Sequence, residues 1–252
     1  MLFEMLAAGA NAAPQNKFGF AEALQAGGAI SYSVVTVLGI MSFGSFFILF
    51  TKWWDQSKVM KQALAMRGGF WTAPTLRESA AKLDKDSPWR MIVDDALIAE
   101  EQHGKMTNAL DAHDWLYGTL ARSEATINSR LASGLPFLAT VGATAPFIGL
   151  FGTVVGIYRA LIAIGIAGSA SIDKVAGPVG EALIMTALGL LVAVPAVLAY
   201  NFLQARNKRI AEGLTAFSTS ILAYLSSNGA VRPQASAALK APAAVSNPPR
   251  KA

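Results

Sequence analysis

The fold is decided by residues 135–201, LPFLATVGATAPFIGLFGTVVGIYRALIAIGIAGSASIDKVAGPVGEALIMTALGLLVAVPAVLAYN, two apolar runs joined by a short polar connection. The first run carries one charged residue, Arg159, and the second carries none over residues 182–205. A helix rises about 1.5 Å per residue, so about 20 apolar residues cross the hydrocarbon core of a membrane. Each run is therefore predicted to be a transmembrane helix, one over residues 131–158 and the other over 178–205.

A third apolar run lies earlier in the chain, at residues 29–50, and contains no charged residue. It is followed at once by Lys52, Trp53 and Trp54. Basic and aromatic side chains of this kind favour the boundary between lipid and water. This run is predicted to be the first transmembrane helix.

The composition is that of a membrane protein. Hydrophobic residues make up 53% of the 252 residues and charged residues 15%, and the mean hydropathy is +0.41, more apolar than an ordinary soluble domain. There is no cysteine, which excludes disulfides and thiolate metal sites. His103 and His113 lie ten positions apart, which is no metal-binding spacing, so both are expected at the surface.

The distribution of lysine and arginine predicts the orientation in the membrane. One of these residues precedes the first span, eleven lie in residues 51–130, two in residues 159–177 and seven after residue 205. By the positive-inside rule, residues 1–28 and 159–177 lie outside, whereas residues 51–130 and the C-terminus are cytoplasmic. Because the basic residues are spread along the membrane flanks, the net charge of +5 does not indicate nucleic-acid binding.

The loop over residues 51–130 is predicted to be a helical cytoplasmic domain. Apolar residues recur every three or four positions from residue 89 to residue 131, with no proline before Pro136. We therefore expect one long helix that leads from this domain into the second span. The apolar face of this helix begins with Trp89, Ile92, Val93, Ala96 and Leu97. The acidic residues around 94–101 are interpreted as a solvated face of the same helix or, alternatively, as a docking surface.

The two ends of the chain are expected to differ in order. After the third span, apolar residues recur at near-heptad spacing over residues 206–227, which predicts a cytoplasmic helix packed on the loop helices. The tail over residues 228–252 is rich in alanine, proline and serine and is expected to be disordered. Residues 1–28 are interpreted as a flexible or interfacial arm, with a processed leader as the alternative.

Small residues recur at helical spacing along the second and third spans. In lipid, small side chains let two helices approach closely. Two such stripes in one short chain favour a tightly packed oligomer, and packing within a single chain is the alternative interpretation. The positions are Gly142, Gly149, Gly152 and Gly156 in the second span and Gly189 and Ala193 in the third.

Three polar residues accompany these stripes. Thr153 and Thr186 lie on or beside them, and a threonine hydroxyl in a helix commonly bonds to its own backbone. Glu181 is more unusual, because a carboxylate near the bilayer is costly and usually faces a partner, a cavity or an ion path. It also follows Pro178 by three residues, so it is alternatively interpreted as an acid in the first turn of the third helix.

Catalysis has no support in the sequence. There is no nucleophile paired with a base, no phosphate-binding loop and no metal-ligand spacing. We therefore predict no enzyme activity, no cofactor and no metal site. The residues by themselves indicate an all-α membrane protein with three transmembrane helices, two of them extended into a cytoplasmic helical bundle, and an oligomeric state.

The two quoted runs also resemble a known family. GATAPFIGLFGTVVGIYRALIAI followed by GPVGEALIMTALGLLVAVPAVLAYN is similar to the MotA/TolQ/ExbB proton channel family, and most closely to its ExbB branch. The likeness is strong over about residues 130–205. The chain departs from the family pattern at Val155 and at some positions within residues 176–183. It keeps the polar residues Thr153, Glu181 and Thr186.

The resemblance implies a function and partners. It implies a homopentameric ring in the inner membrane of a Gram-negative bacterium, with a periplasmic N-terminus and a cytoplasmic C-terminus. Thr153, Thr186 and Glu181 would line its interior around the helices of an ExbD-like partner that carries the protonatable aspartate. With a TonB-like protein, the assembly would use the proton-motive force for outer-membrane transport such as iron-siderophore uptake. The alternatives are a TolQ-like subunit of the Tol-Pal envelope system and a membrane scaffold that conducts nothing.

Overall fold

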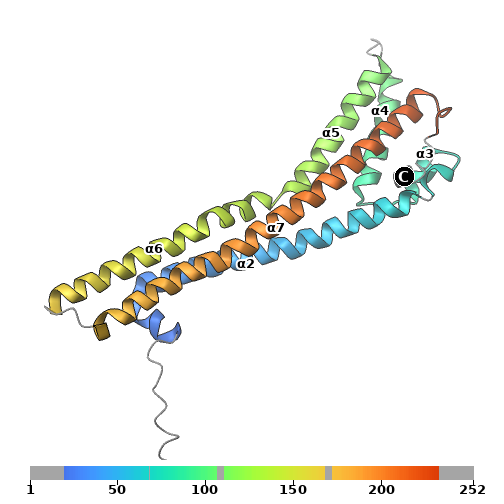
Figure 1. The fold of residues 1–252 in the computed structure, drawn as a ribbon. Helices are drawn as coiled ribbons and strands as arrows, with labels where there is room; N and C mark the ends of the chain where they lie inside the picture. The colour runs from blue at the N-terminus through green and yellow to red at the C-terminus, as the bar shows by residue number, and fades with distance from the viewer. Residues whose placement is uncertain (1–19, 68, 107–110, 168–171, 233–252) are drawn as a thin grey trace, which may run out of the picture. The chain divides into compact units, whose positions relative to one another are not determined.

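A computed structural model describes residues 20–67, 69–106, 111–167 and 172–232, and these residues contain helices and no strand. The leader and the disordered tail expected at the two ends of the chain lie mostly outside them. The α-helices, labelled in Figure 1, are α2 (Phe20–Arg67), α3 (Leu76–Ala81), α4 (Pro88–His103), α5 (Ala112–Ala132), α6 (Leu135–Ala167) and α7 (Ile172–Ser226), and a short 3-10 helix, η1 (Phe70–Thr72), precedes α3.

The chain divides into two compact units. Unit 1 comprises residues 1–50 and 134–202, and unit 2 comprises residues 51–133 and 203–252. Within the part of the chain that the structure describes, three helical stretches are long and apolar enough to cross a membrane, and they contain the runs at residues 29–50, 131–158 and 178–205. The expectation of an all-α protein with three long apolar helices is therefore confirmed.

Unit 1 consists of α6 and the adjoining parts of α2 and α7. Its core is small and is built mainly from valine, alanine and leucine, while large side chains such as Phe43, Phe147 and Leu191 are about 70% exposed. In water this exposure would be unfavourable, but in lipid it carries no such cost. The core residues are Val34 and Leu38 from α2, Val141 and Ala145 from α6, and Met185, Ala193 and Ala196 from α7.

The helix expected to run unbroken from residue 89 into the second span is in fact three helices. Gly104 caps the end of α4, and α5 begins only after Asp111, whose side chain accepts a hydrogen bond from the His113 amide. A second break separates α5 from α6, where Ser133 is non-helical and Gly134 has φ 86°. Glycine adopts positive φ without a steric penalty, so the apolar rhythm continues across a break in the backbone.

Two helices continue from unit 1 into unit 2. One is α7, which contains the third span and continues to Ser226, as expected. The other is α2, which continues to Arg67, whereas the spacing predicts the second span in this role. Lys52 and the two tryptophans after it mark a polar boundary without ending the helix, because lysine and tryptophan are compatible with helical backbone.

The core of unit 2 forms where its helices pack around Trp89. The indole nitrogen of Trp89 donates a hydrogen bond to the Val59 carbonyl, 3.2 Å away, and its ring lies 5.6 Å from that of Phe217. The expected apolar face of α4 is buried here, with Ile92, Val93 and Ala96 fully inaccessible. The near-heptad residues of α7 belong to the same core, namely Ile210, Leu214, Ile221 and Leu225, with Phe217 packed against it.

The C-terminal end of α5 is held by side chains from two other helices of unit 2. Lys52 donates to the Arg130 carbonyl at 2.9 Å and to the Ser133 hydroxyl at 2.7 Å. Asn207 donates to the Leu131 carbonyl at 3.0 Å. These bonds satisfy carbonyl groups that the end of a helix leaves without a partner, so the break after α5 is a stabilised feature.

The acidic residues around 94–101 are engaged in local pairs. Asp94 lies 3.2 Å from Arg90, and Glu101 lies 2.7 Å from Lys105, each pair one turn apart on the helix surface. Asp95 accepts a hydrogen bond from the buried Ser123 hydroxyl of α5. These contacts support the interpretation of a solvated face with local structural roles.

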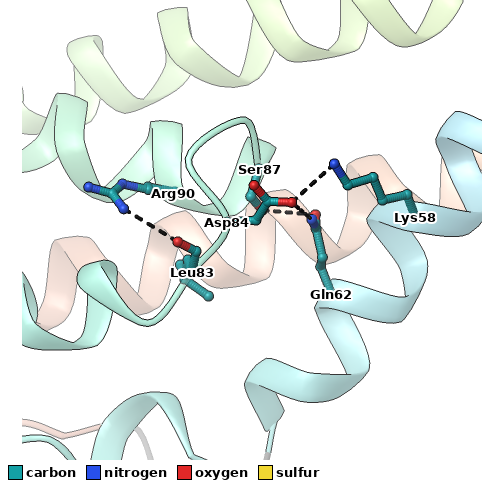
Figure 2. Close-up of polar contacts among 6 residues, drawn as sticks. All are labelled: Lys58, Gln62, Leu83, Asp84, Ser87 and Arg90. Atoms are coloured by element: carbon teal, nitrogen blue, oxygen red, sulfur yellow. Dashed lines mark hydrogen bonds and ion pairs between the residues drawn. The ribbon is translucent and has the colours of Figure 1, made fainter.

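A polar cluster joins the loop after α3 to α2, as Figure 2 shows. The Asp84 carboxylate lies 3.0 Å from the Lys58 ammonium group and accepts a hydrogen bond from Gln62 at 3.3 Å. Gln62 also accepts a hydrogen bond from the Ser87 hydroxyl, and Arg90 donates to the Leu83 carbonyl. The hydrogen bond from Lys58 is the main cause that lowers the pKa of Asp84.

Replacing this lysine should change the titration of Asp84. A lowered carboxyl pKa means that the pair contributes to folding above the ordinary aspartate range and is lost as the pH falls through the lowered value. We expect Lys58→Met to raise the pKa of Asp84 toward its ordinary value, measured by carboxyl-carbon NMR of the full chain in nanodiscs. Lys61→Met is the control, and an equal shift in both variants would contradict the pairing.

Candidate proton path between the membrane helices

The helices α6 and α7 of unit 1 approach each other at glycine. A Cβ atom on Gly149 would lie 2.7 Å from the Met185 carbonyl oxygen, and one on Gly189 would lie 2.7 Å from the Ala145 carbonyl oxygen. At each glycine, such an atom would also be 3.0 Å from the Cα of the other. Only glycine allows this backbone separation.

The other small residues expected on the stripes also lie at contacts within unit 1. A Cβ on Gly142 would clash with the Val197 side chain, one on Gly152 would lie 2.9 Å from Met185, and one on Gly156 would lie 3.0 Å from Ala182. Ala193 is buried in the core of the unit. In the single chain, these positions therefore pack helices of the same chain against each other. This is the alternative interpretation of the small-residue stripes, in place of contacts between subunits.

Thr153 and Thr186 meet across this contact. Their hydroxyl groups are hydrogen-bonded to each other, and the Thr153 hydroxyl also lies 2.9 Å from the Ala182 carbonyl. Both residues are half-buried. A hydroxyl can donate and accept at once, so a pair of hydroxyls provides a step along which a proton can be passed.

Glu181 lies on a different face of α7. Its carboxylate accepts a hydrogen bond from the Ser31 hydroxyl of α2, and both side chains are buried, at 4% and 6% exposed. Glu181 and Thr186 are five positions apart, which turns a helix by about 140°, so the two side chains diverge. The structure thus brings Thr153 and Thr186 together and holds Glu181 apart from them.

The alternative interpretation of Glu181 as a first-turn acid is wrong. The helix α7 begins at Ile172, so Glu181 is in its third turn, and Pro178 lies inside the helix. Proline at an interior position removes one backbone hydrogen bond but does not have to end a helix whose neighbours support it. The carboxylate is therefore too far from the free amides of the helix start to be stabilised by them.

Ser31 was not found by inspection of the sequence. It lies in the first apolar run only two positions from Ser33, and the two serines look equivalent there. The one available signal is the pair Gly27–Gly28 just before it, because paired glycines often interrupt a helix. Gly28 is indeed non-helical, with φ 59° and ψ −152°.

Three long apolar helices with a hydroxyl pair between two of them and a buried carboxylate are typical of a membrane protein. Ionisable side chains inside a membrane bundle commonly mark paths for ions or protons, which makes Glu181 a candidate for such a path. The family comparison is more specific. Residues 90–215 match the MotA/TolQ/ExbB proton channel family, and the chain belongs to this family.

Individual relatives share much of the chain. It is 38% identical over 214 residues to the biopolymer transport protein ExbB of Xanthomonas campestris pv. campestris, covering 81% of this chain and 85% of that protein. It is 46% identical over 138 residues to ExbB of Neisseria meningitidis serogroup B, covering 53% and 63%. A Tol-Pal system protein, TolQ of Pseudomonas aeruginosa, is 44% identical over 96 residues, covering 38% and 42%.

Family membership identifies the chain as a membrane proton channel subunit. The matched residues include Thr153, Glu181 and Thr186. Ser31 lies before the matched residues. The family is one of membrane proton channels and not a known class of enzyme.

Proposed function

We propose that this chain is an ExbB-like subunit that works with an ExbD-like partner in the inner membrane of a Gram-negative bacterium. The observation that carries the proposal is the extent of similarity, since the ExbB relative from Xanthomonas campestris aligns with 81% of the chain. The TolQ relative aligns with 38%. A TonB-like protein would pass the resulting movement to transporters of the outer membrane.

In this proposal, several copies form a ring, a pentamer by analogy with the family, and the proton crosses at the interface with the partner helices. Thr153 and Thr186 supply uncharged polar steps, and Glu181 supplies a group that can be protonated. Each charge that crosses releases about 2.3 kcal/mol per 100 mV of membrane potential. The apolar outer surface of unit 1 would meet lipids and neighbouring copies.

The orientation of the chain is part of the same proposal. The eleven basic residues in residues 51–130 and the seven after residue 205 support a cytoplasmic unit 2 and a periplasmic N-terminus. Reaction of single introduced cysteines with a membrane-impermeant maleimide would test this orientation. A chain without natural cysteine is well suited to that measurement.

Proton flux into liposomes tests the channel. We expect flux when the full chain is reconstituted with its ExbD-like partner and a potential is applied, and little flux from the chain alone. Glu181→Gln should lower the flux about tenfold, because the amide keeps the shape of the side chain but does not exchange a proton. Glu212→Gln, an exposed position on the same helix, is the matched control.

The result also separates the alternatives. A complex that assembles normally but conducts nothing would favour the scaffold. Equal flux in Glu181→Gln and Glu212→Gln would remove Glu181 from the path. Purification of the native complex would distinguish the two branches, since a TolR-like single-span partner in place of an ExbD-like one would favour the TolQ-like alternative.

A further inference from the structure

The first membrane helix holds a serine whose hydrogen bond differs from those of its neighbours. The hydroxyls of Ser33 and Ser45 each donate to the carbonyl four residues earlier on α2, both at 2.8 Å. That local bond is the usual one for serine and threonine in a helix. The Ser31 hydroxyl instead crosses to α7 and donates to the Glu181 carboxylate.

The kink at Gly28 explains why Ser31 is different. In a continuous helix, the Ser31 hydroxyl would reach back to the carbonyl of Gly27. Gly28, with φ 59° and ψ −152°, interrupts the helical path between these two residues. The acceptors of Ser33 and Ser45 both lie after the kink, so these hydroxyls keep their local bonds.

Burial makes this hydrogen bond important for the stability of the Glu181 carboxylate. Ser31 and Glu181 are both buried inside unit 1, where a carboxylate without a donor would be strongly unfavourable. The hydroxyl engages the Oε1 atom of Glu181 and so sets the direction of the carboxyl group toward α2. The hydroxyl pair of Thr153 and Thr186 lies on another face of α7.

We infer that Ser31 is a positioning residue for Glu181, and that the kink at Gly28 exists to present its hydroxyl to this carboxylate. The inference rests on the proposed function, because it assigns Glu181 a place on the proton path. It adds the first membrane helix to that path, although Ser31 lies outside the residues that match the family.

Two measurements on the full chain test the inference. In nanodiscs, the infrared carboxyl band that disappears in Glu181→Gln should shift in Ser31→Ala and stay in place in Ser33→Ala. In liposomes with the ExbD-like partner, Ser31→Ala should lower proton flux about fivefold, the scale of one typical intramolecular hydrogen bond. Ser31→Thr, which keeps a hydroxyl, should restore both signals.

A second variant tests the role of the kink independently. Gly28→Ala places a side chain at a backbone conformation that is essentially restricted to glycine. A Cβ there would meet no atom closer than 3.9 Å, so the strain comes from the backbone. We expect the same band shift and a similar loss of flux as in Ser31→Ala, whereas Gly39→Ala, in an open part of α2, should change neither.

The outcomes separate this inference from the proposed function. If Glu181→Gln lowers the flux but Ser31→Ala leaves the band or the flux unchanged, the positioning role is wrong and the channel proposal stands. If Glu181→Gln conducts like the parent protein, both the path through Glu181 and the role of Ser31 are overturned. A shifted band together with reduced flux, rescued by Ser31→Thr, supports both.

Discussion

Gly149→Ala is expected to destabilise the membrane unit more than any other single methyl group added to α6. The new Cβ would lie 2.7 Å from the Met185 carbonyl oxygen and 3.0 Å from the Gly189 Cα, and both are backbone atoms of α7. A side chain could rotate away, but a helix backbone has to move as a whole. Overpacking of this kind costs about 1–3 kcal/mol.

The same helix offers a matched control. Gly165 lies near the end of α6, and a Cβ there would meet no atom within 4 Å. Gly165→Ala should be neutral or slightly stabilising, because alanine favours a helix over glycine by about 1 kcal/mol. Thermal unfolding of both variants in nanodiscs is the measurement. Equal unfolding temperatures would show that α6 and α7 do not approach each other at Gly149.

Separation of α6 from α7 should also affect the hydroxyl pair. Thr153 follows Gly149 by one helical turn, and its hydroxyl bonds to Thr186 and to the Ala182 carbonyl. A small outward shift of either helix would break these bonds before it exposed the core. Gly149→Ala is therefore expected to lose proton flux at temperatures where it is still folded.

The transmembrane helices were readable from the sequence because lipid imposes a simple rule. A backbone inside a membrane has to satisfy its own hydrogen bonds, so a long apolar run almost has to be a helix. The amphipathic face that starts at Trp89 was readable for a related reason, since one side of α4 packs on a core and the other faces water.

The ends of the helices were less predictable. The apolar rhythm passes through Ser133 and Gly134 without interruption, yet the backbone breaks there and side chains from α2 and α7 stabilise the break. Pro178 looked like a helix start but lies inside α7. At the break after α5, tertiary contacts that are absent from the local sequence stabilise the backbone.

The candidate site shows the same limit at the level of single residues. Thr153, Thr186 and Glu181 stood out because polar groups are rare in apolar runs. Which of them contact each other depends on the rotation of each helix about its axis, and that rotation is determined by the glycine contacts. Ser31 and Ser33 are alike in sequence, and the structure alone shows that Ser31, which follows the kink at Gly28, has its partner on α7.

Replacing both hydroxyls of the threonine pair should abolish conduction while leaving the protein stable. In Thr153→Val alone, the Thr186 hydroxyl loses its partner inside the helix contact, and an unsatisfied polar group costs about 1–3 kcal/mol. In the double variant Thr153→Val with Thr186→Val, both hydroxyls are gone and the shapes are retained, a change that can be nearly neutral. The double variant should therefore unfold at a higher temperature than the single one.

Proton flux, unlike the unfolding temperature, should be lower in the double variant than in Thr153→Val alone. With no hydroxyl between α6 and α7, we expect proton flux to fall at least about a hundredfold, the scale of a lost positioned proton-transfer group. Thr144→Val is the control, because that exposed hydroxyl bonds only to the Thr140 carbonyl of its own helix and should leave both flux and stability unchanged. If the double variant were stable and still conducted, the hydroxyl pair would be a packing device, and the proton would have to pass along the face of α7 that carries Glu181.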